Sequence, residues 1–523
     1  MDRILTTPAA LRRAAQKWPD APAIIDDQWA DSPHPHMALS WSEFLDEVRT
    51  FAGALVASGI AHGDRVALWS PNSWHWPVAA LGVHYAGATL VPLNTRYTAG
   101  EAVEIIERSD AKAVVVSTGF LGGNHLADLL RDHAGSLPDV VVGILLETTD
   151  DPPEGVLSWC DFHSRATDDT RVEADQRADA VAPEDISDIL FTSGTTGKSK
   201  GVLAEHQQTM AGSQAWGANG QLGPDDRYLM VNPYFHTFGY KAGILPCTLF
   251  GVAMIPLAVY SPTEAMKLAE AQRATVFPGA PTIFQTILDD PTRSDHDLSS
   301  LRLVVTGAAI VPVVLIERLQ SDLGVETVIT AYGLTEASGF VSTCTPDDDD
   351  DTVANTCGRA FDGMEITLSE QGEVLARGKM VMRGYLDDPT ATAETIDADG
   401  WLHTGDIGTL DDRGNLKITD RLKDMYICGG FNVYPAEIEQ TLARIDGVTE
   451  SAVIGVPDGR LGEVGRAYVT IREGADIDED AVIAYAKEHL ANFKVPRSVV
   501  FVDAFPRNAA GKILKRDLTA TAH

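Results

Sequence analysis

A glycine-rich loop placed directly after a strand-like segment is the feature that constrains this chain most. Residues 186–191 are rich in apolar side chains, and residues 192–201, TSGTTGKSKG, follow at once. Glycines let the backbone turn tightly and approach a ligand closely, while amides, hydroxyls and two lysines supply donors and positive charge. The stretch therefore predicts a buried strand that leads into an anion-binding loop, suited to a polyphosphate.

Two other interpretations of this loop are possible from its composition. Its GKS ending is typical of a Walker loop, but that motif needs four residues between its glycines. Only two residues separate Gly194 from Gly197, so the Walker interpretation is rejected. A solvated Gly/Ser/Thr loop without a ligand remains the other alternative, because such loops are common.

Length and charge restrict the class of protein. A chain of 523 residues is too long for one core, so at least two domains are expected. The net charge of −34 argues against nucleic acid or an anionic membrane as the main partner. An anionic substrate would therefore need a local basic patch. Adaptation to salt is a second explanation of the acidity, and it stays open.

Cysteines and apolar segments bear on the cellular setting. The five cysteines form no CxxC pair, which favours a reduced, cytoplasmic protein. Residues 74–94 and 242–260 are long enough to span a bilayer, but both contain internal glycine and proline. Each is better explained as a helix, a glycine stop and a short strand, so no transmembrane segment is expected.

Alternating strand and helix patterns predict an α/β fold with parallel sheets covered on both faces. The acidic segment 147–184 is expected to be an irregular surface connection, and the aspartates at 347–351 a solvated loop. A small α/β unit is expected after Lys423. The expected strands are 65–69, 113–117, 186–191, 228–231, 274–277, 303–306, 327–330, 452–456 and 467–471.

Chemically active side chains follow three of these strands. Residues 232–240, 307–309 and 331–336 contain glycine, hydroxyl, aromatic and acidic side chains just after a strand ends. Ligands of open parallel sheets bind beyond the carboxyl ends of the strands. We therefore expect these three segments to form one ligand site.

Five motifs occur in order along the chain. They are TSGTTGKSKG at 192–201, AYGLTE at 331–336, HTGD at 403–406, DRLKD at 420–424 with CGGFNVYPAEIE at 428–439, and PRNAAGKILKR at 506–516. Together they resemble the adenylate-forming superfamily of acyl-CoA synthetases, luciferases and peptide-synthetase adenylation domains, over nearly the whole chain. Ser199 departs from the pattern, which usually has proline there.

The resemblance implies an architecture and a reaction. Residues 1–422 would form a large AMP-binding domain and residues 423–523 a small mobile α/β domain, with Lys423 as the hinge. ATP and a carboxylic acid would give acyl-AMP and pyrophosphate, and CoA would then displace AMP. The residues implied to bind ATP are Thr192, Ser193, Gly194, Thr195, Thr196, Gly197, Lys198, Ser199, Lys200, Gly307, Ala308, Ala309, Tyr332, Gly333, Asp406, Arg421 and Lys512.

Individual roles follow from the same resemblance. Tyr332 would stack on adenine, and Asp406, supported by Arg421, would accept the ribose hydroxyls. Thr335 would bind phosphate and Glu336 would hold Mg²⁺, a hard cation that prefers oxygen ligands. Negative charge develops on the phosphates as pyrophosphate leaves, so Thr335 and Mg²⁺ would act by stabilising that charge.

The remaining implied roles concern the second substrate and the chemistry. Lys512 would bridge the carboxylate and the α-phosphate, its alternative being a solvated tail lysine. Gly429 and Gly430 would line the CoA channel, where a side chain would block the thiol. His236 would be a gate at the acyl pocket, with a hydrogen-bonded core histidine as an equal alternative.

The acid itself is suggested by the HTFGYKAG segment at 236–243. This segment resembles actinobacterial ligases of steroid-degradation acids, such as the indanedione propanoate, and a medium- or long-chain fatty acid is the alternative. Lys241 would hydrogen-bond a ring ketone, or else it is a surface lysine.

Other functions also stay open: an acyl-AMP ligase that loads a carrier protein, and a non-catalytic nucleotide-binding protein. A homodimer and an acetyltransferase acting on Lys512 are further hypotheses, the second because acetylation would delete the charge that the first step needs.

Overall fold

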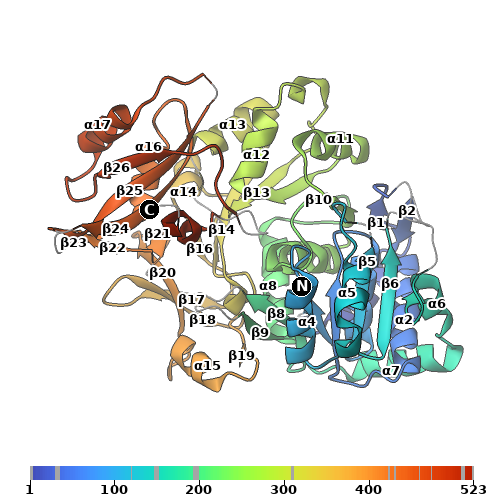
Figure 1. Cartoon of the computed structure of the whole chain (residues 1–523). Helices are drawn as coiled ribbons and strands as arrows, with labels where there is room; N and C mark the ends of the chain where they lie inside the picture. The colour runs from blue at the N-terminus through green and yellow to red at the C-terminus, as the bar shows by residue number, and fades with distance from the viewer. Residues whose placement is uncertain are drawn as a thin grey trace.

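The chain folds into a large N-terminal part built on α/β sheets and a smaller C-terminal α/β part (Figure 1). This confirms the expected fold class. The computed structural model describes residues 4–29, 36–118, 120–146, 152–192, 199–307, 311, 313–421, 424–428, 431–458, 460–472, 474–507 and 513–520.

A first, mainly parallel sheet runs in the order β16-β15-β14-β13-β12-β10-β11-β1-β2. The parallel strands from β10 to β14 end at the same edge, which is where sequence analysis expected a ligand site. Its strands are β1 (Pro22–Asp26), β2 (Met37–Ser40), β10 (Arg227–Met230), β11 (Ala253–Pro256), β12 (Val276–Gly279), β13 (Leu303–Gly307), β14 (Thr327–Tyr332), β15 (Ser342–Thr343) and β16 (Arg359–Ala360).

A second sheet runs in the order β19-β9-β8-β4-β3-β5-β6-β7. Strands β8 and β9 pair antiparallel, with Thr192 opposite Lys200. The predicted phosphate loop therefore lies between the two strands of a hairpin. Its strands are β3 (Arg65–Trp69), β4 (Thr89–Pro92), β5 (Ala111–Thr118), β6 (Val140–Leu145), β7 (Leu157–Ser158), β8 (Ile186–Thr192), β9 (Lys200–Glu205) and β19 (Gly384–Tyr385).

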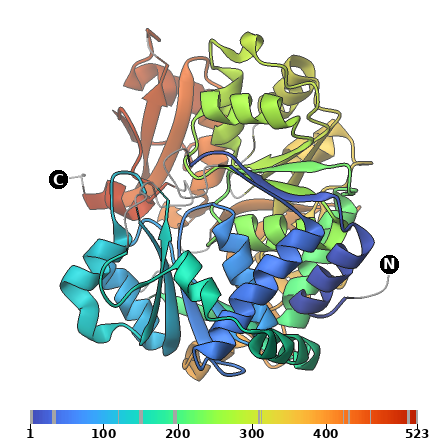
Figure 2. The same cartoon turned by 90° about the vertical axis from the view of Figure 1, so that its right-hand side faces the viewer.

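Helices cover these sheets (Figure 2). Helix α2 shows why: Ser40 and Glu43 form a capping box at its start, and its apolar face, including Phe44, Val48 and Phe51, is fully buried. The helices of this part are α1 (Thr7–Lys17), α2 (Trp41–Ala57), α3 (His75–Tyr85), α4 (Ala99–Arg108), α5 (His125–His133), α6 (Trp159–Ser164), α7 (Asp168–Ala180), α8 (His206–Asn219), α9 (Thr237–Gly239), α10 (Leu245–Phe250), α11 (Pro262–Gln272), α12 (Pro281–Leu288), α13 (Val313–Leu323), α14 (Asp350–Asn355) and α15 (Pro389–Thr395).

The two apolar stretches tested for membrane insertion are core elements, as expected. Helix α3 is followed by Gly87 and strand β4, and helix α10 by Gly251 and strand β11. Both glycines have a positive φ, +75° and +76°, which stops each helix at little steric cost. Across the described residues, no helix combines the length and the apolar character needed to cross a bilayer.

The expectation of an irregular connection at 147–184 was wrong, because two helices, α6 and α7, form within this segment. Only Ala174 and Ala178 of α7 are buried, so the sequence carries almost no apolar period. Thr167 and Thr170 form its capping box, and Asp175 pairs with Arg49 of α2. Long-range ion pairs of this kind leave no local pattern.

A small antiparallel sheet in the order β17-β18-β20-β21 packs below the first sheet. It carries Asp406 on β20, so its attachment matters for the site. Its strands are β17 (Met364–Leu368), β18 (Glu373–Gly378), β20 (Leu402–Leu410) and β21 (Leu416–Arg421).

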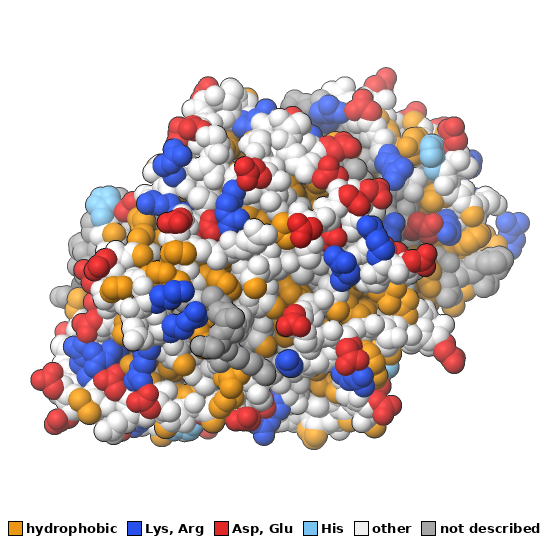
Figure 3. Space-filling view, turned by 180° about the vertical axis from the view of Figure 1, so that it is seen from behind, with side chains coloured by type: hydrophobic (Ala, Val, Ile, Leu, Met, Phe, Trp, Pro, Cys, Tyr) orange, Lys and Arg blue, Asp and Glu red, His pale blue; other side chains and the backbone are white. Residues whose placement is uncertain are grey.

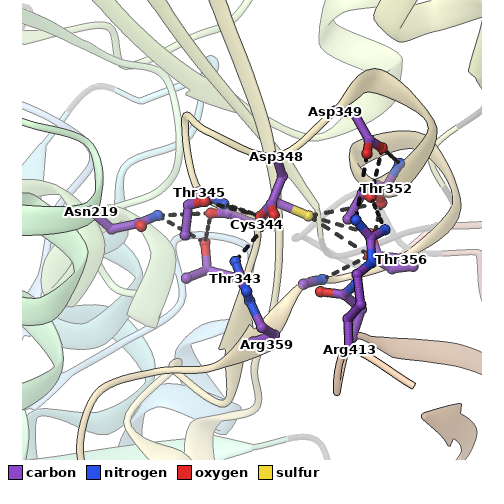
Figure 4. A network of polar contacts seen from close by, with 12 residues as sticks. Asn219, Thr343, Cys344, Thr345, Asp348, Asp349, Thr352, Thr356, Arg359 and Arg413 are labelled. Carbon is purple, nitrogen blue, oxygen red and sulfur yellow. Dashed lines mark hydrogen bonds and ion pairs between the residues drawn. The ribbon is translucent and has the colours of Figure 1, made fainter. Parts of the chain in front are cut away.

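The aspartate run at 347–351 helps to make that attachment. Four of its five side chains are exposed, as expected of a solvated segment, but Asp350 and Asp351 begin helix α14, so the run is not only a loop. Asp349 accepts the Thr352 N–H at 2.8 Å and thereby starts α14 (Figure 4). Arg413, from the β20–β21 turn, reaches Asp349 at 3.5 Å and also donates to the Thr352 hydroxyl. Asp348 pairs with Arg359 of β16 at 3.1 Å. The run thus ties the sheet with Asp406 to the first sheet.

The C-terminal part has a hydrophobic core of its own, built on Tyr426, Val433, Ile438 and Val453. The predicted hinge Lys423 and the domain boundary beside it lie outside the described residues and stay predictions. The elements here are β22 (Tyr426–Cys428), β23 (Phe431–Val433), α16 (Pro435–Leu442), β24 (Val448–Asp458), β25 (Gly462–Ile471), α17 (Glu479–His489), β26 (Ser498–Phe501) and α18 (Lys515–Ala520).

Figure 3 shows one face of the molecule, on which acidic and basic side chains are interspersed. The basic side chains do not gather there into a single field. On this face, therefore, no large patch of one sign of charge stands out.

Candidate active site

The predicted site residues that the structure describes come from several elements of the N-terminal part. Gly307 ends β13, Tyr332 ends β14, the turn Thr335–Ala337 follows it, and Asp406 lies on β20. Thr192, Ser199 and Lys200 flank the phosphate loop at the ends of β8 and β9. The calls that lie outside the described residues are Ser193, Gly194, Thr195, Thr196, Gly197, Lys198, Ala308, Ala309, Lys423, Gly429, Gly430 and Lys512.

Tyr332 and Asp406 meet directly. The Tyr332 hydroxyl donates a hydrogen bond to Oδ2 of Asp406, whose side chain is almost fully buried. Arg421 is paired with Asp406 in the register of β20 and β21. This backbone position is compatible with the supporting role expected of Arg421. The structure thus brings together the two residues expected to hold adenine and ribose.

Gly333 turns the chain between Tyr332 and the Thr335–Ala337 turn. A Cβ on Gly333 would lie 1.9 Å from the carbonyl oxygen of Gly339, so no larger residue fits this conformation. The tight loop returns the chain so that Phe340 packs on Trp216, with ring centroids 5.9 Å apart. Thr335 and Glu336 are thereby held at a fixed point beside the end of β14.

Tyr385 connects Glu336 to the phosphate hairpin, and sequence analysis missed it. Its hydroxyl donates to Oε1 of Glu336 at 2.9 Å, and Nζ of Lys200 lies 4.7 Å from the centroid of its ring. Strand β19, which carries Tyr385, pairs with β9 opposite Val202. No motif pointed to Tyr385, because its partners are distant in the sequence.

A carboxylate held in this way suits Mg²⁺, which usually binds one or two protein carboxylates together with phosphate oxygens. Across the described residues, no group of three His, Cys, Asp or Glu is arranged to bind a metal by itself. A metal at Glu336 would therefore depend on the nucleotide for the rest of its oxygen ligands.

The Tyr385→Phe variant tests this arrangement. Burial, and then the nearby Glu336 charge, raise the pKa of Tyr385, so its hydroxyl stays protonated and donates. A hydrogen bond to a charged group contributes about 1.5–3 kcal/mol, so its loss should weaken MgATP binding by about tenfold or more. We expect KM for MgATP to rise in steady-state kinetics while KM for the acid stays within twofold. An equal rise in both constants would contradict this role.

His236 caps the short helix α9 at the carboxyl end of β10. Its Nδ1 accepts the N–H of Phe238 at 3.2 Å, and burial lowers its pKa to about 4. The imidazole is therefore neutral at pH 7. Phe238 and Phe340 both pack against Trp216, so the two segments expected to line the acyl pocket share one aromatic contact.

Lys241 is not a surface lysine, so that alternative was wrong. It lies in a π-helical turn, Tyr240–Ile244, and its side chain is fully buried. Its Nζ is 2.9 Å from Oδ1 of Asp188 on β8, the strand that leads to the phosphate loop. Asp188 also accepts the hydroxyls of Ser187 and Thr209. The ion pair connects the two large sheets, and the ketone-donor role of Lys241 stays a prediction.

His84 lies next to this ion pair, and we expect it to make the stability of the fold depend on pH. Its Nε2 is 2.9 Å from the Ser187 carbonyl oxygen, and burial, aided by the Lys241 charge, lowers its pKa to about 4. Below pH 6.5 the unfolded chain takes up the proton first, so stability is complete above that pH and falls toward pH 4. The slope reaches about 1.4 kcal/mol per pH unit.

The His84→Gln variant should therefore lose less stability than the wild type between pH 7 and pH 5, measured as the thermal midpoint. His36, which is exposed, provides the matched control His36→Gln, expected to keep the wild-type slope. If His84→Gln and the wild type had the same slope, a neutral buried His84 would be ruled out.

The chain matches the AMP-binding enzyme family over residues 11–386 and the AMP-binding enzyme C-terminal domain over residues 437–512. Its fold is similar to ATP-bound MatB from Rhodopseudomonas palustris, with a TM-score of 0.84, 31% identity and coverage of 99% of each chain. The fold and the matched domains define an adenylate-forming enzyme. The chain belongs to the AMP-binding enzyme family and, within it, to the ATP-dependent acyl-CoA synthetases.

Two relatives are similar over almost their whole length. The chain is 56% identical over 515 residues to 3-[(3aS,4S,7aS)-7a-methyl-1,5-dioxo-octahydro-1H-inden-4-yl]propanoyl:CoA ligase of Rhodococcus jostii. It is 55% identical over 515 residues to the ligase of the same name from Mycobacterium tuberculosis. Each alignment covers 98% of this chain and 98% of the relative.

Proposed function

We propose that this acyl-CoA synthetase activates a bicyclic propanoate that carries two ring ketones, the acid named in the two relatives. The observation that carries the proposal is identity of 55–56% along 98% of both chains, well above the 31% shared with MatB. The reaction would consume ATP, the acid and CoA, and release AMP, pyrophosphate and the thioester.

The residues around the nucleotide would act by position and charge. Tyr332 would leave its bond to Asp406 to stack on adenine, so that Asp406 accepts the ribose hydroxyls. Thr335 would donate to phosphate, and Lys200 would place positive charge at the mouth of the phosphate loop. Mg²⁺, when bound at Glu336, would neutralise part of the phosphate charge.

The remaining steps would use Lys512, His236 and the glycines at 429–430. Lys512 would lie between the carboxylate and the α-phosphate, where a cation reduces the repulsion of two anions. A neutral His236 would close the acyl pocket without adding charge. Gly429 and Gly430 would give the CoA thiol room to reach the acyl-adenylate.

A panel of acids tests the proposed substrate. Pyrophosphate release would be measured with the dioxo-indane propanoate, octanoate and hexadecanoate, each with and without CoA. A site that hydrogen-bonds polar substrate groups discriminates strongly, so we expect kcat/KM for the diketone to exceed the others by about 100-fold or more. Higher kcat/KM for either fatty acid would overturn the proposed substrate, and pyrophosphate release with no CoA-dependent release of AMP would favour a carrier-protein loader.

A further inference from the structure

A single buried asparagine holds both sides of the loop that leads to His236. Asn72 follows β3 and is only 4% exposed. Its Nδ2 lies 3.0 Å from the carbonyl oxygen of Met230, 2.9 Å from that of Asn232 and 3.3 Å from that of Leu257. Its Oδ1 accepts the N–H of Tyr234 at 2.9 Å. The nitrogen and the oxygen of this amide therefore both bond to residues 230–234, and the nitrogen also reaches Leu257.

These contacts cross between the two large sheets. Strand β3 belongs to the second sheet, whereas Met230 ends β10 and Leu257 follows β11, both in the first sheet. Asn72 thus joins the carboxyl ends of strands from both sheets. This is the edge at which a ligand is expected.

Two more amides extend the connection. Asn232 donates to the carbonyl oxygen of Pro278 on β12 at 2.9 Å. Gln28 donates to the carbonyl oxygen of Asn72 at 3.0 Å and accepts the N–H of Ala258 at 2.7 Å. We call Gln28, Asn72 and Asn232 the amide clamp. It ties the segment after β1 to the ends of β3, β10, β11 and β12.

The loop depends on the clamp because residues 231–236 form no helix or strand. A buried carbonyl or N–H left without a partner costs about 1–3 kcal/mol, so the Asn72 bonds decide which loop conformation is stable. Beyond Tyr234, the His236 N–H bonds to the Pro233 carbonyl oxygen at 3.1 Å, and α9 then begins. The position of His236 follows from the bonds just before it.

We propose that Asn72 is a positioning residue for acid recognition, acting through the loop that carries His236. The inference rests on the proposed function in one respect, that this loop lines the acyl pocket. Asn72 touches neither the phosphate hairpin nor the Tyr332–Asp406 pair in the contacts described here. Its influence should therefore appear in KM for the acid and not in KM for ATP.

The test compares Asn72→Ala with the wild type and with the matched control Asn219→Ala. Asn219, at the end of α8, also donates to a backbone carbonyl, that of Cys344 at 2.8 Å (Figure 4). Its described hydrogen bonds go to Thr343 and Cys344 and not to residues 231–236. With the acid that the wild type uses best, we expect Asn72→Ala to raise KM for the acid about tenfold, with KM for ATP within twofold. Tenfold corresponds to about 1.4 kcal/mol, one well-made hydrogen bond. Asn219→Ala should leave both constants unchanged.

Two further variants separate positioning from simple loss of folded protein. Asn72→Asp keeps an acceptor for Tyr234 but turns a carboxylate toward three carbonyl oxygens, so its KM for the acid should exceed that of the alanine variant. Asn232→Ala removes only the bond to Pro278 and should raise the same constant by less. A purely structural role would lower kcat through the active fraction and leave both KM values unchanged.

The Asn72 variants and the acid panel test separate claims, so one can fail without the other. If the wild type prefers a fatty acid, the proposed substrate fails, and the Asn72 comparison is made with that fatty acid. If Asn72→Ala leaves KM for the acid unchanged, or raises both KM values equally, the positioning role is overturned whatever the acid.

Discussion

Replacing Lys512 by alanine is expected to slow acyl-adenylate formation by about 10²–10³-fold, the cost of removing one preorganised electrostatic contact from a transition state. The reason is the charge of the first step, in which a carboxylate must approach the α-phosphate. Pyrophosphate release from ATP and the acid, without CoA, measures that step. Thioester formation from preformed acyl-adenylate should survive, since the thiol attacks the acyl carbon there and no carboxylate has to approach the α-phosphate.

Lys515 provides the matched control for Lys512. It lies in the same basic segment, and its Nζ is 2.8 Å from Oε1 of Glu439 of helix α16. Lys515→Ala should leave adenylation within about twofold, because its charge is already paired in the C-terminal part. Equal losses in the two variants would point to a general effect of tail charge, and an unimpaired Lys512→Ala variant would remove the catalytic role.

Replacing Lys241 by methionine is expected to destabilise the protein by about 3–5 kcal/mol, the usual cost of leaving one buried charge without its partner. Asp188 would then remain fully buried with no cation beside it. The double variant Lys241→Met/Asp188→Asn should recover more than half of the loss, because the asparagine oxygen can still accept the Ser187 and Thr209 hydroxyls. Thermal and urea unfolding of the two variants measure the difference.

The same variants decide the second role considered for Lys241. If its ammonium also donates to a ring ketone, the folded Lys241→Met protein should lose kcat/KM on the diketone acid more than on octanoate. Equal losses on both acids would leave the ion pair as the whole role of Lys241. A double variant no more stable than Lys241→Met would contradict the ion pair as the source of the stability.

Sequence patterns predicted the strands well because parallel, doubly covered strands are continuous apolar runs. Strand β3 was predicted with its observed bounds, and β8 and β13 to within one residue. Helix α7 was missed because two buried alanines leave no visible period. Its ion pairs join it to residues more than a hundred positions away, such as Asp175 to Arg49, and leave no local pattern either.

The site divides in the same way. Motif residues such as Tyr332, Glu336 and Asp406 could be selected as candidates because each lies in a short recognisable run, and their roles stay predictions. Tyr385 and Asn72 could not, since their roles depend on contacts with distant segments, 49 residues away for Glu336 and 158 for Met230. Local sequence reveals groups that face a ligand far better than the groups that hold them in place.

The most direct test of the account is a single-turnover experiment with the diketone acid. Enzyme in excess would be mixed with ATP, Mg²⁺ and the labelled acid, quenched, and analysed by mass spectrometry before and after CoA is added. The account predicts an acyl-adenylate that accumulates without CoA and converts to the CoA thioester, with AMP in equal amount, once CoA is present. Thioester formation with no adenylate intermediate, or an adenylate that CoA leaves unchanged, would contradict it.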